Sequence, residues 1–384
     1  MSEYRMRDNT FLVVLWFAGL VPVILPQSDE FTSGSDVVTK LQAKSVLPEN
    51  SAEATKRVGF LLLPGFPLMS YASAVEPLRA ANALTGRTLY AWEHLSFDDA
   101  ALAASNGVAF PADARLSEAR DLDALFVCAG GNPGQFDDAA TFAALRALAR
   151  RGLPVGGMSG GPYVLARAGL LDGYRCTLHW EHIPAFVEEF PLLRVERTLF
   201  VIDRDRTTCA GGIAALDMMI EFIARAHGRD LAAAISEWFL RTHSREGKDS
   251  QRMGLRERTG VANAKVLGTL ALMESRLETP SSRAELAAAA GVTVRQLERL
   301  FADHLNTTIG RRYVEIRVAR ARTLLRQSTL SVAEIAVACG FVSTSHFSRV
   351  YKDQFGLSPR RERETSGAGE ASFPVPGGRD AELS

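Results

Sequence analysis

A pattern of helix, glycine turn and helix occurs twice in the last third of the chain, and it restricts the fold more tightly than any other sequence feature. The spacing of apolar residues predicts helices over residues 282–290, 293–304, 332–338 and 344–355. A turn glycine, Gly291 or Gly340, lies nine residues after Ser282 in the first copy and after Ser331 in the second. A long arginine-rich helix over 309–325 lies between the copies. Two helix-turn-helix units joined by a helix form an all-helical domain.

The charge distribution suggests what this helical region binds. The 384 residues carry 44 Lys and Arg against 44 Asp and Glu, so the formal net charge is zero. Residues 256–364 hold 18 Lys and Arg against 11 Asp and Glu, a balance of +7, so the other residues carry −7. A basic segment attached to an acidic body indicates an anionic partner for the basic segment. We therefore expect double-stranded DNA as that partner.

Helix-turn-helix units read DNA with the second helix of each unit, which lies in the major groove. The predicted contact residues are the exposed early positions of these two helices: Arg295, Gln296, Glu298, Arg299, Thr344, Ser345, His346 and Arg349. Arginine matches the paired acceptors of guanine, and serine or threonine can bond to several base edges. An ordinary charged helix surface explains single arginines, but it does not explain two such surfaces within one basic region.

The region before residue 245 has a different pattern, in which short apolar runs alternate with helices. Runs at 58–63, 123–128 and 153–158 are typical of buried parallel strands, and helices are predicted over 70–84, 139–151, 161–169 and 213–241. A strand pair is predicted over 193–197 and 199–203. The alternation indicates an α/β domain with an open, mostly parallel sheet, followed by the all-α double helix-turn-helix domain.

Three of the predicted strand ends carry glycine, and ligands of such sheets bind beyond the carboxyl ends of the strands. The residues at these ends are Gly65, Gly130, Gly131, Asn132, Ser159 and Gly160. We expect them to outline one small-molecule pocket, with His179, Trp180 and Glu181 of the "HWEH" segment beside it. An indole and a carboxylate could together hold a quaternary ammonium or guanidinium group. The alternative is that Trp180 belongs to the core and Glu181 to the surface.

The segment Gly157-Met158-Ser159-Gly160-Gly161 fits G-x-S-x-G, the elbow that carries the serine nucleophile of many hydrolases. A serine needs an adjacent base to act as a nucleophile. The order Ser–Asp–His could be met by Ser159, Asp217 and His227 or His243, but those partners lie in a predicted helix or a boundary segment. We therefore expect no catalytic residue, with Ser159 as a helix cap and the backbone N–H groups of the elbow as a site for a ligand's carboxylate. A hydrolase or amidase with an appended DNA-binding domain is the alternative.

The sequence contains no grouping that predicts a metal or a cofactor. The two histidines of "HWEH" lack a third ligand, and the four cysteines are scattered without a C-x-x-C pair. Scattered cysteines favour a reducing compartment over a disulfide-stabilised fold.

The ends of the chain differ from these two domains. Residues 11–26 form an apolar run of 16 residues, short for a membrane span. We predict an extension and linker over 1–56; an anchor or signal is the alternative, and with it a membrane-anchored sensor. The other predicted boundaries are a ligand-sensing domain over 57–245, a linker over 246–261, the DNA-binding domain over 262–364 and a disordered tail over 365–384.

Both domains resemble known families. The segments "LAAAAGVTVRQLERLF" and "VACGFVSTSHFSRVYKDQFGLSPRR" closely resemble AraC-type transcriptional regulators. The segments "RVGFLLLPGF", "CAGG", "GGMSGGPYVLARAGLLDG" and "TLHWEH" resemble the DJ-1/PfpI, or class I glutamine amidotransferase-like, fold of the GlxA-type regulators. One departure is Glu362, where the AraC family usually has an aromatic residue, which leaves the terminal packing open.

The resemblance implies further properties. Enzymes of the DJ-1/PfpI fold have a cysteine at the elbow and a carboxylate from the first helix; here the elbow holds Ser159, Ser70 takes the carboxylate position, and Glu76 lies further along. Similar regulators activate catabolism of arginine, carnitine and glycine betaine. We therefore expect a cytoplasmic activator of transcription, not an enzyme, with a small effector such as an amino acid or betaine-like zwitterion. RNA polymerase and a second copy of the chain are further expected partners.

Overall fold

The structure, a computed structural model, describes residues 54–98, 101–243 and 245–369. The predicted extension and its apolar run at 11–26 lie outside the described residues, except for positions 54–56, as do residues 370–384 of the predicted tail. No helix within the described ranges is long and apolar enough to cross a membrane.

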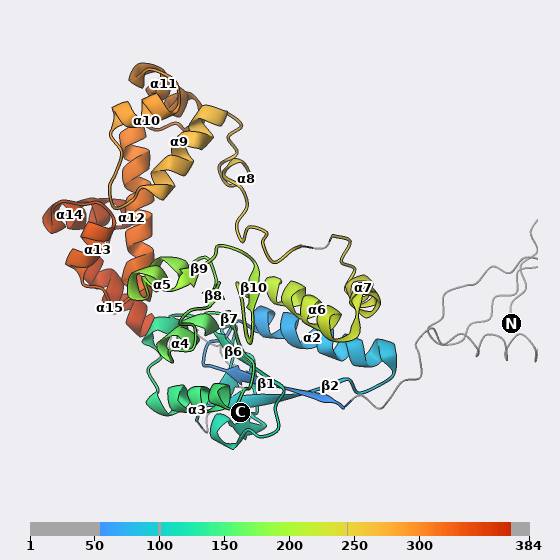
Figure 1. Ribbon diagram of the computed structural model, residues 1–384. Coiled ribbons are helices and arrows are strands. Elements are labelled where there is room, and N and C mark those ends of the chain that lie inside the picture. Colours follow the sequence, from blue (N-terminus) through green and yellow to red (C-terminus); the bar gives the residue numbers. More distant parts are fainter. Residues whose placement is uncertain (1–53, 99–100, 244, 370–384) are drawn as a thin grey trace, which may run out of the picture. The chain divides into compact units, whose positions relative to one another are not determined.

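Seven strands form one open sheet in the first half of the described chain (Figure 1). Their order is β10-β11-β7-β6-β1-β2-β5, and all neighbours are parallel except the antiparallel pair β10–β11. The strands are β1 (Lys56–Leu62), β2 (Tyr90–Ser96), β5 (Ala114–Arg115), β6 (Ala124–Ala129), β7 (Val155–Ser159), β10 (Phe200–Asp203) and β11 (Arg206–Cys209). Every residue of β6 and β7 is buried, which explains why their sequences are apolar or glycine apart from Ser159 at the end of β7. The predicted open, mostly parallel sheet is confirmed.

Helices cover both faces of this sheet. The helices are α2 (Leu68–Thr85), α3 (Ala139–Arg150), α4 (Gly161–Arg167), α5 (Ile183–Glu189), α6 (Ala214–His227) and α7 (Arg229–Trp238), with short 3-10 turns η1 (Leu116–Glu118) and η2 (Pro133–Gln135). Successive residues of β1 point to opposite faces: Phe60 and Leu62 pack with α2 and α6, while Leu61 packs in the cluster that includes α3 and α4. The core of this domain therefore has two halves, one on each face of the sheet.

The predicted strand pair over 193–197 and 199–203 is wrong. The first strand, β9 (Arg194–Val195), pairs in parallel with β8 (Arg175–Cys176), and β10 pairs with β11. β11 escapes sequence analysis because "RTTC" lacks an apolar run. Its place between β7 and β10 nevertheless buries Arg206 and Cys209.

Other predicted elements differ in detail. The helical stretch predicted over 213–241 is two helices, because the chain turns at Gly228 with φ of 92° between α6 and α7. The sequence analysis did not predict β2, α5 or the small antiparallel pair β3 (Leu102–Ala103) and β4 (Ala109–Phe110).

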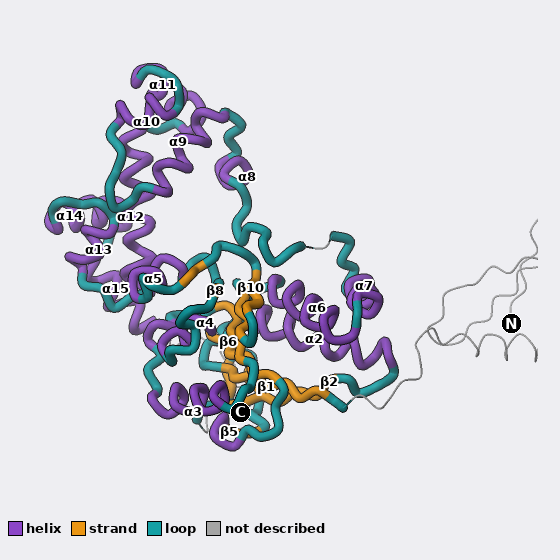
Figure 2. The backbone as a smooth tube through the Cα atoms, viewed as in Figure 1, coloured by secondary structure: helices purple, strands orange, loops and turns teal. Residues whose placement is uncertain are grey.

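From residue 255 onward the described chain consists of helices and loops (Figure 2). The helices are α8 (Leu255–Thr259), α9 (Ala264–Ser275), α10 (Arg283–Ala289), α11 (Val294–Leu305), α12 (Ile309–Gln327), α13 (Val332–Ala338), α14 (Thr344–Phe355) and α15 (Pro359–Gly369). The four predicted helix-turn-helix helices correspond to α10, α11, α13 and α14, and α12 joins the two units. The predicted all-α double helix-turn-helix domain is confirmed.

The two units share the same local chemistry. Ser282 is the N-cap of α10 and Ser331 is the N-cap of α13, each in a capping box with a glutamate three residues later. Gly340 has φ of 72°, and a side chain there would overlap the backbone of residue 277, so only glycine fits this turn. Leu297 and Phe301 of α11 and Phe347 and Tyr351 of α14 are buried, which leaves the opposite face of each second helix exposed.

Candidate functional site

The elbow after β7 is a strained turn whose shape depends on glycine. Ser159, the last residue of β7, has φ of 58°, a left-handed conformation that costs a non-glycine residue about 1–2 kcal/mol. A side chain at Gly161 would overlap the carbonyl oxygen of Val127, and one at Gly157 would lie 2.6 Å from the nitrogen of Pro162. The expectation that Ser159 caps the next helix is wrong, because the N-cap of α4 is Gly160.

The strand ends predicted to form a pocket do meet around this elbow. A side chain at Gly130 would overlap the carbonyl oxygen of Gly65, so the ends of β1 and β6 touch. A Cβ at Gly160 would lie 2.9 Å from Pro133 of η2, and the His179 amide donates a 3.1 Å hydrogen bond to the Ser159 carbonyl. Four segments far apart in the sequence therefore converge beyond the carboxyl edge of the sheet.

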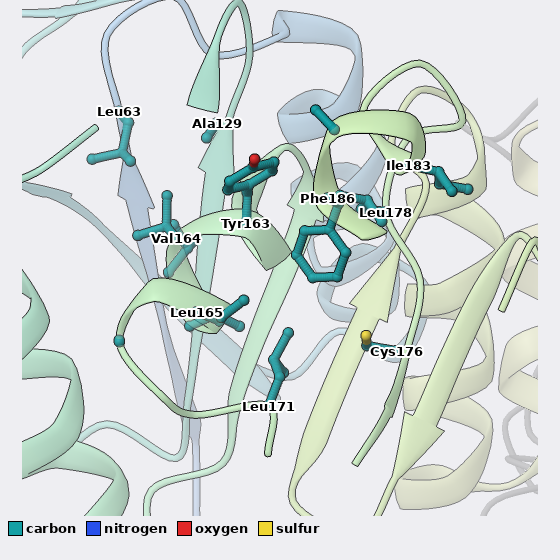
Figure 3. Close-up of a cluster of buried hydrophobic side chains, with 14 of the residues drawn as sticks. Leu63, Ala129, Tyr163, Val164, Leu165, Leu171, Cys176, Leu178, Ile183 and Phe186 are labelled. Atoms are coloured by element: carbon teal, nitrogen blue, oxygen red, sulfur yellow. The ribbon is translucent and has the colours of Figure 1, made fainter. Parts of the chain in front are cut away.

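Buried apolar side chains of α4 and α5 pack against one another next to the elbow. Figure 3 shows Tyr163, Val164 and Leu165 of α4 beside Phe186 of α5 and the strand residue Ala129. The rings of Tyr163 and Phe186 pack edge to face with centroids 5.2 Å apart. This packing holds α4 against α5. The same apolar cluster therefore positions both the elbow, which precedes α4, and the "HWEH" segment, which precedes α5.

Among the residues that the structure describes, those expected to activate Ser159 as a nucleophile do not contact it. Asp217 is buried and binds Arg241 and Arg245, and the ring of His227 packs edge to face on Tyr90. Neither residue has a described contact with the serine, which is only 5% exposed, and nor has the alternative base His243, whose Nδ1 lies 3.0 Å from the Thr242 hydroxyl. A serine without an adjacent base remains a weak nucleophile, so the hypothetical triad is not assembled.

The position opposite the elbow holds a hydroxyl in place of a carboxylate. Ser70 accepts a 2.7 Å hydrogen bond from the amide of Gly212, and Glu76 lies further along α2 in an ion pair with Arg79. A Cβ at Gly211 would lie 2.6 Å from Cβ of Ser159 and 2.7 Å from the Ser70 hydroxyl, which places these three residues side by side.

Thiols do not substitute for the serine. Burial raises the pKa of the nearby Cys209 to about 12 and also raises the pKa of Cys128. Both thiols therefore stay protonated at neutral pH and are not nucleophiles.

The "HWEH" segment follows β8 and presents one aromatic face to solvent. Trp180 is 41% exposed, and its ring lies 5.4 Å from that of His179. Burial lowers the pKa of His179, although Glu181 at 3.9 Å opposes the shift. Glu181 is exposed beside them. The structure therefore places an exposed indole and an exposed carboxylate, 3.9 Å from His179, next to the elbow.

The second histidine of the segment is buried and neutral. Burial lowers the pKa of His182 to about 4, and its Nδ1 lies 3.1 Å from Oε1 of Gln327, at the end of α12. Asn132 makes a similar contact, because its Nδ2 donates a 2.6 Å hydrogen bond to the carbonyl of Arg326. Among the described residues, no group of three or more His, Cys, Asp or Glu side chains could hold a metal ion.

Sequence analysis missed the residue that lies on the exposed tryptophan. The guanidinium carbon of Arg252 is 4.5 Å from the centre of the Trp180 ring, within the range of a cation–π contact. No local signal could have revealed this pair, because the two residues belong to separate segments that only the fold brings together.

The predicted DNA-contact residues lie on the exposed faces of α11 and α14. Those classed as exposed are Arg295, Gln296, Arg299, Thr344, Ser345, His346 and Arg349. Within the described ranges, Arg295, Arg299 and Arg349 form no ion pair, which leaves their guanidinium groups available. Ser343 accepts a hydrogen bond from the amide of His346 and so begins α14 at the residues expected to enter the groove.

Two of the predicted DNA contacts have structural partners as well. Glu298 is half-buried and accepts a 3.1 Å hydrogen bond from the amide of Ile309, which connects α11 to the start of α12. Gln296 accepts a 2.9 Å hydrogen bond from the amide of Thr293 in the capping box of α11. These contacts account for both side chains without DNA.

Comparison with known proteins assigns the family. Residues 56–225 match the DJ-1/PfpI family, and residues 286–365 match a helix-turn-helix domain. The chain is 44% identical over 336 residues to the HTH-type transcriptional regulator GbdR of Pseudomonas aeruginosa, covering 87% of this chain and 91% of GbdR. It is 47% identical over 304 residues to CdhR of the same organism (79% and 90% covered) and 45% identical over 314 residues to GlxA of Rhizobium meliloti (82% and 97%). The chain belongs to the GlxA-type transcriptional regulators of the AraC family.

This membership decides between the two functional hypotheses. The GlxA-type relatives are transcriptional regulators that share both domains over nearly their whole length, and the protein is a DNA-binding transcriptional regulator like them. The hydrolase alternative finds no support in these relatives or at Ser159. Promoter DNA is therefore the partner of the GlxA-type helical domain, as the charge distribution and the two exposed helices indicated.

Proposed function

We propose that this GlxA-type regulator is a cytoplasmic activator that binds a small zwitterion at the converging strand ends and responds by changing how its helical domain engages DNA. The observation that supports the ligand's charge is the Trp180 face, which already holds a guanidinium group at 4.5 Å. With Glu181 beside it, this face suits the cationic end of an amino acid or a betaine.

We place the ligand's carboxylate at the loop after β6. The amide of Gly160 donates to the carbonyl of Ala129, so it is not available to an anion. By contrast, no described residue accepts a hydrogen bond from the amides of Gly130 and Gly131, and successive unpaired amides attract anions. In this arrangement Ser159 and Gly160 form the floor of the site, while Gly65, Asn132 and His179 border it.

The predicted DNA residues remain the basis of the second half of the proposal. Arg295 and Arg299 would read one major groove, and Ser345 and Arg349 the next, because the two units are joined by the single helix α12. A ligand can shift this engagement only if it binds two states of the regulator with different affinity. Contact with RNA polymerase and pairing of two copies on the promoter complete the proposed mechanism of activation.

The test is titration calorimetry of the full chain with arginine, carnitine, glycine betaine and dimethylglycine. We expect one of them to bind, and Trp180→Ala to weaken it by about 0.5–2 kcal/mol, the usual range of a cation–π contact. Trp238→Ala is the matched control, because Trp238 is 49% exposed but lies on α7. Both variants should still bind DNA in the absence of ligand. If none of the four binds, the ligand class is wrong; if Trp180→Ala binds as tightly as the unaltered chain, and does so also when Arg252, which lies on the same ring, is replaced by glutamine, the cation site is wrong.

A further inference from the structure

Residues 247–252, which we call the strap, run along the edge of the sensing domain just before the helical region. The amide of Leu199 donates to the carbonyls of Gly247 at 2.9 Å and Asp249 at 3.1 Å, and Ser250 forms an antiparallel bridge with Thr198. Cβ at Gly247 would lie 2.9 Å from the ring and the carbonyl oxygen of Phe200, so the strap packs closely against this edge. The linker predicted over 246–261 therefore begins as a docked segment.

The side chain of Gln251 holds the strap next to the proposed effector site, but its hydrogen-bonding groups are not all satisfied. Nε2 of Gln251 lies 2.7–2.9 Å from three acceptors, namely the Thr177 hydroxyl and the carbonyls of Leu178 and Thr198. An NH₂ group has two hydrogens, so it cannot serve all three fully. The Oε1 atom of Gln251 is buried and receives no hydrogen bond from any described residue. A buried unsatisfied acceptor disfavours the docked state, which makes the strap easier to release.

The next residue of the strap is the one that lies on Trp180. Arg252 forms no ion pair within the described residues; its guanidinium is held over the indole at 4.5 Å. Burial lowers the pKa of Arg252, and the positive charges of Arg258 and Arg197 add to that effect, with Glu274 opposing it. The guanidinium is therefore held on the indole without an ion pair to any described residue that would oppose its displacement.

We propose that Arg252 is an internal competitor for the effector, whose cationic group displaces the guanidinium from Trp180 and thereby releases the strap. The inference rests on the proposed function, in which Trp180 receives the ligand's cation. It defines the ligand class further: a guanidinium or alkylammonium group small enough to occupy the position of the Arg252 guanidinium. Because the strap leads directly into α8, its release changes the connection to the DNA-binding helices.

Competition has a measurable consequence for affinity. An effector that must displace Arg252 binds with an apparent dissociation constant equal to the intrinsic constant divided by the fraction of chains in which the strap is released. Removing the guanidinium removes that penalty. With a cation–π contact of about 0.5–2 kcal/mol, the expected gain in affinity is about 2- to 30-fold.

The experiment compares Arg252→Gln with the control Arg256→Gln, which removes an exposed arginine from α8 of the same linker. Calorimetry of each full-length chain with glycine betaine and arginine should show tighter binding for Arg252→Gln and unchanged binding for the control. Arg252→Lys, which keeps a cation, should bind with intermediate affinity.

Hydrogen exchange supplies a second readout. In the unaltered chain, ligand should speed exchange at the amide of Leu199, which the docked strap protects; in Arg252→Gln, exchange there should be fast without ligand. If the unaltered chain binds a probe through Trp180 but Arg252→Gln binds it no more tightly, the competition is refuted while the proposed function stands. Binding to Arg252→Gln alone would support the competition strongly. If no variant binds any probe, both proposals fail.

Discussion

Replacing Glu362 tests whether a buried carboxylate stabilises the second helix-turn-helix unit. This residue, where the family usually has an aromatic side chain, is 1% exposed in α15. Its Oε1 accepts hydrogen bonds from Nε of Arg322 at 3.0 Å and Nε of Arg326 at 2.7 Å, both on α12. Two charges from α12 therefore take the place of aromatic packing, and they connect the last described helix to the helix that joins the two units.

The magnitude follows from the exposure of the partners. Hydrogen bonds to charged groups contribute about 1.5–3 kcal/mol each, and breaking a fully buried ion pair costs about 3–5 kcal/mol. The side chains of Arg322 and Arg326 are 38% and 47% exposed, so water can solvate them once the carboxylate is gone. We therefore expect Glu362→Ala to lower the free energy of unfolding of this unit by about 2–3 kcal/mol, and Glu362→Gln by about 1 kcal/mol.

The assay is native-state hydrogen exchange of α14 and α15 in the full-length chain, with Glu364→Ala as the matched control. Glu364 lies two residues along the same helix and pairs with Arg360 on the surface, where such a pair contributes about 0–0.5 kcal/mol. If Glu362→Ala lowers the hydrogen-exchange protection of α15 no more than Glu364→Ala does, the buried carboxylate does not stabilise the unit.

The pH dependence of α15 protection independently tests whether the pKa of Glu362 is lowered or raised in the folded state. Burial raises the pKa of Glu362, but the hydrogen bonds and charges of Arg322 and Arg326 outweigh it, so the pKa is lowered overall. A carboxyl group with a lowered pKa in the folded state stabilises that state fully above its ordinary pKa of about 4.3, and the stabilisation is lost as the pH falls through the folded value. Protection of α15 should therefore decrease on acidification below about pH 4.3, and this decrease should be absent from Glu362→Gln. Protection that increased on acidification would mean that burial dominates.

Two further predictions concern DNA and the elbow. Arg295→Ala and Arg349→Ala should each weaken specific DNA binding by about 1–3 kcal/mol and relax base preference at separate positions about one helical turn apart, as measured by footprinting; unchanged footprints would refute the assignment of the reading helices. Ser159→Ala should keep ligand-dependent activation in a reporter strain, whereas Gly161→Ala, whose new methyl group overlaps the β6 backbone, should lose stability by about 1–3 kcal/mol or more and lose the response. If Ser159→Ala lost the response while its stability was unchanged, the Ser159 hydroxyl would have a chemical role.

Features that depend on a few consecutive residues were predictable from the sequence. The capping boxes at Ser282 and Ser331 and the turn glycines at Gly291 and Gly340 act within three to nine residues, so pattern and spacing suffice to define both helix-turn-helix units. The same holds for the buried strands β6 and β7, because burial on both faces selects continuous apolar or glycine runs. The convergence of strand ends at the elbow followed from the parallel sheet itself.

Contacts between distant segments were decided only by the tertiary structure. Nothing in "RTTC" marks β11 as an interior strand; its partners β7 and β10 determine its burial. Ser159 adopts its left-handed conformation where α4 begins directly against the backbone of β6, and charges on α12 stabilise Glu362 in the interior. The contact of Arg252 with Trp180 depends on the docking of residues 247–251 against an edge strand. Local sequence patterns report propensity and capping, but a charge on an aromatic face requires two segments to be brought within a few ångströms, and only the folded chain does that.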